Sequence, residues 1–493
     1  MLVREQNIVK QKLIPQVNSI EFPFDGIYLL EEGCSVCLEI MDNGSDEIFE
    51  LVRERFHSFW KVTPVLALKP LQKAFSNEEH YEISITETLL TLRANNCKAV
   101  NLALYTLRQL AEVQRGTLTI RGFFLPVTEI ADEPLFSFRA IHFCVFPETT
   151  YTQLEQRLRL AAYHKYNYAV VEFWGTYSYE CFPALAWKEK AWGRASITRL
   201  VRLCRELGIT LCPQFNLLGH ASGARGGNGK HAVLDFHREY ESLFEPDGWC
   251  WCLSNPETRR VLTDVVHELL ELFEDPPYFH IGCDEAHNLA SCLECRRSNI
   301  EDLLTDHITY FHDLLQKRSC RSVMWHDMLL TRDPEGPYAG YVANGKKEDC
   351  HENLLSRLPK DMVIADWQYD LPPRMSDADP EPEWPTWKAF LDKGFEVLFC
   401  PWDKNEVILS QAKKAAERKL KGCIQTTWHL GYRYPQMALF FHTGAQAAWN
   451  VENFVRGYNG NLTHHFRQVS QDMGVDSYEE CGFTPLQYMP RPS

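Results

Sequence analysis

The sequence predicts an α/β protein in which a (β/α)8 TIM barrel is preceded by a small α+β domain. A chain of 493 residues is too long for one ordinary core, which favours more than one domain or a large barrel. From about residue 136, short apolar runs alternate with longer amphipathic stretches, as in a βα repeat. Before about residue 130 the order is strand, strand, helix. We therefore expect a front domain at residues 1–130, a barrel at 131–455 and a tail at 456–493.

The front domain is predicted from one clear strand, a weaker one and a helix. Tyr81–Ile85 alternates apolar and polar residues, and Thr88–Leu92 does so less strictly. Apolar residues recur near helical spacing between Lys98 and Val113. The segment from Leu125 to Pro134 reads as a linker leading out of this domain.

The barrel is predicted from eight apolar runs with helical stretches between most of them. The runs lie near Phe138–Phe146, Tyr168–Phe173, Thr210–Phe215, Tyr278–Gly282, Ser322–Trp325, Val363–Trp367, Val397–Pro401 and Gly422–Trp428. The helical stretches include Leu154–Lys165, Ile197–Leu207, Asp302–Arg318 and Gln411–Lys419. A doubly wound open sheet is the alternative, although no Gly-rich phosphate loop follows the first run. The tail is polar and could carry short helices packed on the barrel.

Charge and composition restrict the class of partner. A net charge of −15 argues against a nucleic-acid surface, and no stretch is long and apolar enough to cross a bilayer. The first residues carry no apolar run of signal-peptide length, so we expect a cytoplasmic protein with reduced thiols. Thirteen Trp and twenty Tyr supply flat apolar faces on which sugar rings can stack, although core packing is their commoner role.

Four of the seventeen cysteines are spaced in two close pairs. Cys250 and Cys252 precede the acidic segment described next, and Cys292 and Cys295 follow it. The spacing could make a structural zinc site, although it lacks the longer context of known zinc motifs. Disulfides or free thiols are the alternatives, and no cofactor or catalytic metal is expected.

The most informative segment is the apolar run Tyr278–Gly282 followed by Cys283, Asp284 and Glu285. It reads as a short buried strand whose carboxyl end carries two acids into a cleft. Close, partly desolvated carboxyls push their pKa values apart, so one can donate a proton while the other stays charged. An acidic surface loop is the plainer alternative.

Polar and aromatic residues follow several other predicted strands. Chemistry in a barrel lies at the carboxyl ends of the strands, so these residues are expected to share one pocket. Indole rings, an arginine and carboxylates together suit the faces and vicinal hydroxyls of a sugar. The strand-one candidate is Arg139, and the strand-end candidates are His220, Trp325, Trp367, Trp402, Asp403 and Trp428.

These residues carry a resemblance to the glycoside hydrolase family 20 β-N-acetylhexosaminidases, in particular the branch of hexosaminidase D-type enzymes. The family motif His-x-Gly-Gly-Asp-Glu matches His280–Glu285, with Cys283 replacing the second glycine. The Pro-Gly-His segment of the family matches Leu218–His220, with leucine replacing proline. Its strand-one arginine matches Arg139, and its pocket tryptophans match Trp325, Trp367 and Trp428. The resemblance covers roughly residues 20 to 450 and implies the same barrel.

The resemblance implies an exo-acting retaining glycosidase that removes terminal β-linked GlcNAc or GalNAc from a glycan. Adjacent residues cannot easily straddle a sugar as the two acids of an ordinary retaining enzyme do. In this family the 2-acetamido oxygen of the substrate attacks instead. Glu285 would be the general acid and then the base, with its pKa raised from ~4.3 toward ~6 by burial and by Asp284. Asp284 would accept the amide N–H, Arg139 would hold ring hydroxyls, and His220 would orient a neighbour or serve only the structure.

Three departures from the family leave the choice between gluco and galacto substrates open. Leu430 stands where many members have a Glu that holds the outer hydroxyls. The acid after the second strand is represented by Glu172 or Glu180, and the strand-seven Tyr-x-Asp pair only by Asp403 after Trp402.

Two other classes of protein were compared with this interpretation. A sugar-binding pseudoenzyme could keep the pocket but has no reason to keep both acids. A metal-dependent barrel hydrolase could use His280, Asp284 and His287 as ligands, but strand one carries only the lone His142 rather than a His-x-His pair. The natural glycan and the oligomeric state are not determined by the sequence.

Overall fold

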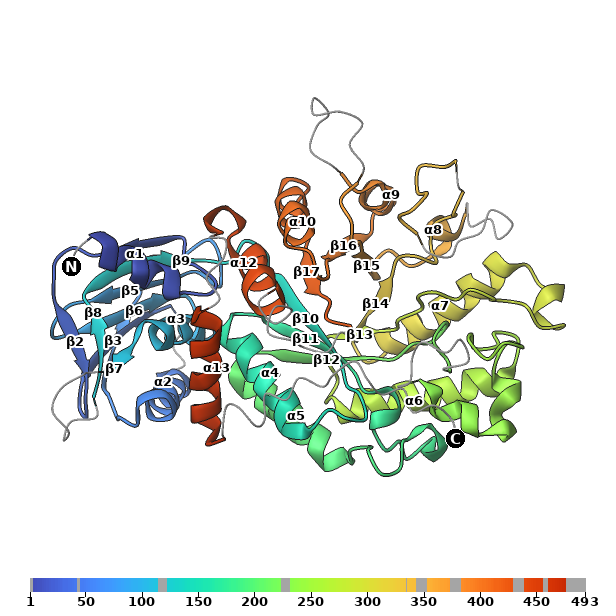
Figure 1. The fold of residues 1–493 in the computed structure, drawn as a ribbon, viewed down its shortest axis with the longest axis horizontal. Helices are drawn as coiled ribbons and strands as arrows, with labels where there is room; N and C mark the ends of the chain where they lie inside the picture. Colours follow the sequence, from blue (N-terminus) through green and yellow to red (C-terminus); the bar gives the residue numbers. More distant parts are fainter. Residues whose placement is uncertain are drawn as a thin grey trace. The chain divides into compact units, whose positions relative to one another are not determined.

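A computed structural model describes residues 3–41, 45–113, 122–222, 231–333, 335–342, 353–372, 383–428, 439–454 and 460–475 (Figure 1). The chain divides into two compact units. The first contains Met1–Ser137, Arg159–Tyr166 and Phe441–Cys481, and the second contains Phe138–Leu158 and Asn167–Phe440. Among the described residues, no helix combines the length and apolarity that a bilayer crossing requires.

The first unit is built on a six-stranded sheet with the order β1-β9-β5-β6-β3-β4. Its strands are β1 (Ser19–Glu21), β3 (Ser35–Ile40), β4 (Val65–Pro70), β5 (Tyr81–Ile85), β6 (Leu90–Ala94) and β9 (Thr128–Asp132). A second sheet has the order β2-β8-β7, from β2 (Ile27–Leu30), β7 (Glu112–Val113) and β8 (Phe123–Pro126). The helices are α1 (Val3–Lys12), α2 (Ser45–Trp60) and α3 (Cys97–Leu110). The α+β class is confirmed.

The predicted exit linker is wrong, because much of it forms strands β8 and β9. In β9 the side chains of Thr128, Ile130 and Asp132 are buried while Glu129 is exposed, and the strand pairs with both β1 and β5. Its five residues alternate too briefly to be recognised without their partners. The burial of Asp132 is compensated by Lys165, whose ammonium lies 2.8 Å from its Oδ2.

The end of the predicted barrel range, from Phe441, and part of the predicted tail also belong to the first unit. Helix α12 (Gly444–Trp449) brings Trp449, whose Nε1–H donates to Asp132 Oδ1 at 2.8 Å. Helix α13 (Gly460–Met473) brings Asp472, which lies 3.0 Å from Nη2 of Arg108 in α3. The predicted tail thus carries a helix, and that helix packs on the front unit.

The second unit is a closed barrel of eight parallel strands, which confirms the predicted fold. The strands run in order as β10 (Phe138–Cys144), β11 (Tyr168–Glu172), β12 (Thr210–Gln214), β13 (Tyr278–His280), β14 (Arg321–Trp325), β15 (Val363–Trp367), β16 (Glu396–Cys400) and β17 (Gly422–Gln425). Figure 1 shows helices outside this ring, among them α5 (Arg194–Leu207), α6 (Pro256–Leu272), α7 (Ile300–Gln316) and α10 (Asn405–Glu417). The helices α4 (Tyr151–Tyr163), α8 (Leu354–Arg357) and α9 (Pro385–Asp392) complete the connections.

Inward-facing side chains from most of the strands fill the barrel and form the floor of the site. Alternate residues such as Phe138 and Ala140 of β10 and Val363 and Ala365 of β15 belong to one buried cluster. Most predicted strands extend beyond the observed carboxyl ends; β17, for example, ends at Gln425 rather than at Trp428. Beyond these ends the chain leaves the sheet, and some of the residues that follow, such as Asn216 and Trp428, line a pocket.

Candidate active site

The acidic segment after β13 is a tight turn with an unusual backbone. Gly282, Cys283 and Glu285 have φ values of +64°, +70° and +50°. Left-handed backbone costs a residue with a side chain about 1–2 kcal/mol, so the surrounding structure must hold this conformation. A Cβ at Gly282 would lie 1.5 Å from Asn216 Oδ1, and one at Gly219 would lie 2.0 Å from the carbonyl oxygen of Asp284. Both glycines therefore permit a close approach that presents the two acids.

His220 lies between the two carboxylates. Its Nε2 is 3.2 Å from Asp284 Oδ2 and 3.3 Å from Glu285 Oε2. Burial alone would lower the pKa of His220, but the two carboxylates outweigh burial and raise that pKa to about 10. The hydrogen bond with His220 lowers the pKa of Glu285, against the raising effect of burial. The prediction of a raised pKa for Glu285 is therefore wrong for the free pocket, because it omitted the cation beside it.

The backbone of Glu285 is held from both sides. Its N–H donates to Asp327 Oδ2 at 2.9 Å, and its carbonyl oxygen accepts the Nε1–H of Trp249 at 2.6 Å. Asp327 also accepts the Nε1–H of Trp367 at 3.2 Å through Oδ1. Burial, reinforced by the charge of Asp284, raises the pKa of Asp327 to about 7. Asp327 thus positions both an acid and an aromatic wall; the sequence placed it at a strand end without giving it a role.

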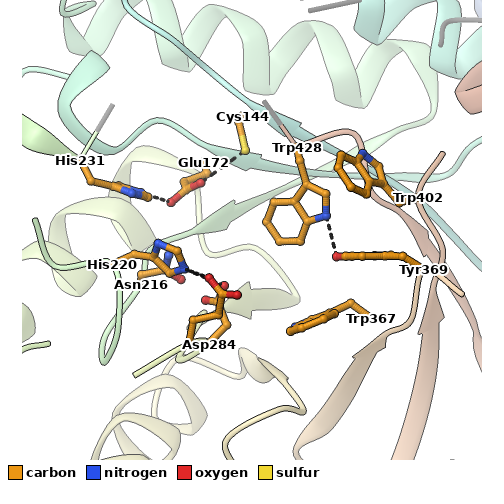
Figure 2. Close-up of a pocket in the computed structure, with 11 residues that line it drawn as sticks. Cys144, Glu172, Asn216, His220, His231, Asp284, Trp367, Tyr369, Trp402 and Trp428 are labelled. Carbon is orange, nitrogen blue, oxygen red and sulfur yellow. Dashed lines mark hydrogen bonds and ion pairs between the residues drawn. The ribbon is translucent and has the colours of Figure 1, made fainter. Parts of the chain in front are cut away.

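Four aromatic side chains form the other side of the pocket. Figure 2 shows Trp367, Tyr369, Trp402 and Trp428 across from His220 and Asp284. Trp367 and Tyr369 stack with centroids 5.2 Å apart, and the Nε1–H of Trp428 donates to the Tyr369 hydroxyl at 2.6 Å. Tyr369 was not predicted, although its place two residues after the strand-end Trp367 is a signal that sequence reasoning could have used.

A third acid lies deeper in the same pocket. Glu172 ends β11, and its Oε1 lies 3.0 Å from His231 Nε2, with both residues 1% exposed. The Cys144 thiol donates to Glu172 Oε2 at 3.5 Å (Figure 2). The open alternative between Glu172 and Glu180 is resolved in favour of Glu172, because Glu180 is exposed and pairs with Arg194. His231 was not predicted, since it stands in a long connection with no periodic pattern.

These side chains enclose a cavity of about 200 Å³. Its lining residues are Cys144, Glu172, Asn216, His220, His231, Asp284, Glu285, Trp367, Tyr369, Trp402 and Trp428. Among the described lining residues, the buried side-chain atoms without a hydrogen-bond partner include Asp284 Oδ1, Asn216 Oδ1 and Trp402 Nε1. An unpaired buried acceptor is costly, so this carboxylate oxygen is suited to a donor group on a ligand.

Three predicted site residues are placed elsewhere. Arg139 is the second residue of β10, near the end away from the pocket, and it pairs in register with Cys423 rather than facing the inward cluster. Trp325 is fully buried in that cluster, beneath the pocket, with its ring 5.3 Å from that of Trp428. Asp403 follows the lining residue Trp402 but does not line the cavity. Side-chain alternation along β10 places Arg139 on the face away from the barrel interior, whereas Trp325 faces inward but lies below the cavity. Leu430 and His429 lie outside the described residues.

The ligand set of the metal-dependent alternative is not brought together. His280 Nδ1 accepts the N–H of Gly282 at 3.0 Å, and its ring lies 4.1 Å from that of Trp325 inside the barrel. In the described part of the chain, the groups close enough to share an ion with Asp284 are His220 and Glu285. The chemistry of this trio is that of proton exchange between an imidazole and two carboxylates.

Comparison with known proteins places this geometry in a family. Residues 170–462 match the model of the catalytic domain of glycosyl hydrolase family 20. The chain belongs to glycosyl hydrolase family 20. The match covers all the strand-end residues that line the pocket except Cys144.

The relatives of this family 20 chain are distant in sequence and close in fold. Beta-hexosaminidase 1 of Coccidioides posadasii is 22% identical over 321 residues, which span 59% of this chain and 49%, about half, of that protein. Flavobacterium johnsoniae chitobiase superposes with a TM-score of 0.69 at 17% identity, covering 97% of this chain and 75% of the other. A Vibrio harveyi exo-β-N-acetylglucosaminidase, solved with N-acetylglucosamine, superposes with a TM-score of 0.67 at 15% identity. The superposition covers 95% of this chain and 79% of the other. The β-N-acetylhexosaminidase of Bacteroides fragilis superposes with a TM-score of 0.66 at 16% identity, covering 94% of this chain and 99% of the other.

Proposed function

We propose that this chain is an exo-acting, retaining β-N-acetylhexosaminidase in which the acetamido group of the substrate is the nucleophile. The observation that carries the proposal is the position of the two acids. Asp284 and Glu285 both contact Nε2 of His220, so they lie on one side of the pocket and cannot flank a sugar ring. A protein nucleophile opposite the acid, as ordinary retaining glycosidases require, is therefore not supplied by this pair.

The pocket contains groups that suit an acetamido substituent. Asp284 Oδ1 is a buried acceptor without a partner, as is Asn216 Oδ1, and an amide N–H is a matching donor. The Tyr369 hydroxyl, fixed by the indole of Trp428, faces the acid side and would donate to the acetamido oxygen. The attack of that oxygen on the anomeric carbon breaks the glycosidic bond and leaves a positively charged bicyclic intermediate. Asp284, as a carboxylate, stabilises this charge.

In the free enzyme, the proton that the glycosidic oxygen will receive is on His220, beside the proposed general acid Glu285. His220 is protonated and Glu285 is ionised there, as the directions of their pKa shifts require. A bound sugar excludes water and so disfavours separated charges in the pocket. The proton then passes from Nε2 of His220 to Oε2 of Glu285 across 3.3 Å, and Glu285 delivers it to the leaving oxygen. Glu285 afterwards deprotonates the water that opens the intermediate.

The experiment that tests the nucleophile compares two trapping reagents. A thiazoline derived from GlcNAc mimics the bicyclic intermediate, and it should bind at least about a hundredfold tighter than the product GlcNAc. A 2-fluoro sugar with a good leaving group should leave no covalent glycosyl-enzyme detectable by intact mass spectrometry. A stable covalent adduct on Asp284 or Glu285 would show that the protein supplies the nucleophile.

A further inference from the structure

Three thiols and one carboxylate converge at a second place in the barrel unit, outside the pocket. The side chains of Glu245, Cys252, Cys292 and Cys295 each offer one ligand atom, and these atoms lie within 4.8 Å of one another. Cys252 Sγ is 3.7 Å from Cys292 Sγ and 3.8 Å from Cys295 Sγ. Cys250, the fourth cysteine of the two sequence pairs, is buried but is not in this cluster.

The spacing of the sulfur atoms fits a shared tetrahedral metal ion. With Zn–S bonds of about 2.3 Å, the edge between two sulfur ligands of a tetrahedron is about 3.8 Å. A disulfide would bring two sulfur atoms to about 2.05 Å, and all three cysteines are free. The separations between Cys252 and its two partners therefore correspond to co-ligands and are too long for a bond.

The fourth member points to the same conclusion independently. Glu245 is 1% exposed, and among the described residues its Oε1 has no hydrogen-bond partner. Its other oxygen accepts the N–H of Cys292 at 2.6 Å, which orients the carboxylate. The N–H of Cys295 donates to Cys292 Sγ at 3.3 Å, which fixes the position of that sulfur atom. A buried carboxylate with an unpaired oxygen, in a group of ligand atoms that lie within 4.8 Å of one another and include three sulfur atoms, is an expected environment of a cation.

We propose that Glu245, Cys252, Cys292 and Cys295 bind one structural Zn²⁺ ion. Three thiolates and one carboxylate oxygen complete a four-coordinate site, and a site closed by four protein ligands is structural rather than catalytic. The ion would bind as the three thiols release their protons. Ca²⁺ and Mg²⁺ are excluded as preferred occupants, because they take oxygen ligands.

The ion would join the two loops that carry His220 and the acids Asp284 and Glu285. Glu245 and Cys252 lie in the connection from β12 to α6, which also carries His220 and Trp249. Cys292 and Cys295 lie on the segment that continues from Glu285. The same two segments are joined by the hydrogen bond from Trp249 to the Glu285 carbonyl oxygen. The zinc site would therefore stabilise the loop on which the general acid sits.

The direct test is the metal content of the full-length chain purified without chelators. Elemental analysis should find about one zinc per chain, released when the thiols are modified by an organomercurial. Protein produced with cobalt should show the visible absorption bands of tetrahedral Co²⁺ with thiolate ligands. The double variant Cys292→Ser, Cys295→Ser should lose both signals, whereas the matched control Cys181→Ser, at an exposed cysteine, should keep them.

Two results would overturn the proposal without depending on how the variants fold. One is a wild-type chain with less than about a tenth of an equivalent of zinc from zinc-supplemented cells. The other is a disulfide between any two of the three cysteines found by peptide mapping. A strong chelator should also lower the midpoint of thermal unfolding of wild type and leave that of the double variant unchanged. Equal shifts in both proteins would contradict a site at these residues.

Discussion

His220 decides how charge is distributed in the empty pocket. Without it, the buried carboxylate of Asp284 and the partly exposed carboxylate of Glu285 would repel each other, which favours a proton on one of them. With it, the histidine carries the proton within 3.2–3.3 Å of both acids. Glu285, the proposed general acid, is thus ionised in the empty pocket, with a protonated histidine one hydrogen bond away.

The role of Glu285 is tested by the dependence of rate on leaving group. Glu285→Gln cannot donate a proton, and general acid assistance contributes roughly 10²–10⁴-fold. We expect a loss in kcat/KM of this size on aryl glycosides with weakly acidic phenols, and a much smaller loss on highly acidic phenols. Equal losses on both kinds of substrate would contradict the assignment.

The role of His220 is tested by the pH dependence of stability. Its pKa rises from 6.5 in the unfolded chain to about 10 in the folded one. Its stabilisation is therefore fully present below about pH 6.5 and is lost as the pH rises toward about 10. We expect the difference in free energy of unfolding between wild type and His220→Asn, measured by urea denaturation, to shrink across this interval. A difference that is constant or grows with pH would contradict the charged histidine.

The site was only partly predictable from the sequence. The residues Asp284, Glu285, His220, Trp367, Trp402 and Trp428 line one cavity as their strand-end positions suggest. The linear sequence did not indicate that Arg139 faces away from the barrel interior or that Trp325 lies below the cavity. The pKa of Glu285 depends on its distance from His220, which lies on another loop. The order of residues in the sequence does not show this distance.

At the scale of elements, the turn after β13 depends on close backbone approach. Gly282 has φ +64° and would place a Cβ against Asn216, whereas Gly394 has φ +83° with no heavy atom within 4 Å of its Cβ position. Gly394→Ala should cost about 1–2 kcal/mol of unfolding free energy for the left-handed backbone alone. Gly282→Ala should cost more by about 1–3 kcal/mol and should also lower kcat, because it displaces the acids.

The two glycine variants make a matched pair for urea unfolding and steady-state kinetics. Equal stability losses in both, or full activity in Gly282→Ala, would show that the turn tolerates a side chain and that the contact with Asn216 does not fix it.

Elements with a clear local apolar pattern were predicted, and elements that depend on contacts with distant segments were not. The barrel strands and α3 are recognisable because their apolar residues recur over several turns or pairs. Strand β9 and helix α13 depend on contacts with distant segments. Asp132 of β9 forms an ion pair with Lys165, and Asp472 of α13 forms one with Arg108. Whether such an element forms depends on burial against distant segments, and a short stretch of sequence carries no information about that burial.

At the scale of the molecule, we expect weak discrimination between GlcNAc and GalNAc substrates, which differ in the orientation of the 4-hydroxyl. Leu430, which lies outside the described residues, stands in the sequence where many family members have a Glu, and a site without such a carboxylate discriminates by only ~1–3 kcal/mol. We expect kcat/KM values for aryl β-GlcNAc and β-GalNAc within about a hundredfold of each other. A ratio above about a thousandfold, measured side by side, would show that another group such as Glu172 reads the 4-hydroxyl. The cytoplasmic location stays a prediction.

The central claim is that the acetamido group of the substrate performs the attack. It is tested most directly by initial rates on an aryl N-acetyl-β-glucosaminide and on the β-glucoside with the same leaving group. Because an intramolecular nucleophile is worth many orders of magnitude, we predict that kcat/KM for the glucoside is lower by at least about 10⁴-fold. Rates within about tenfold of each other would contradict the account, since the pocket would then hydrolyse a sugar that has no internal nucleophile.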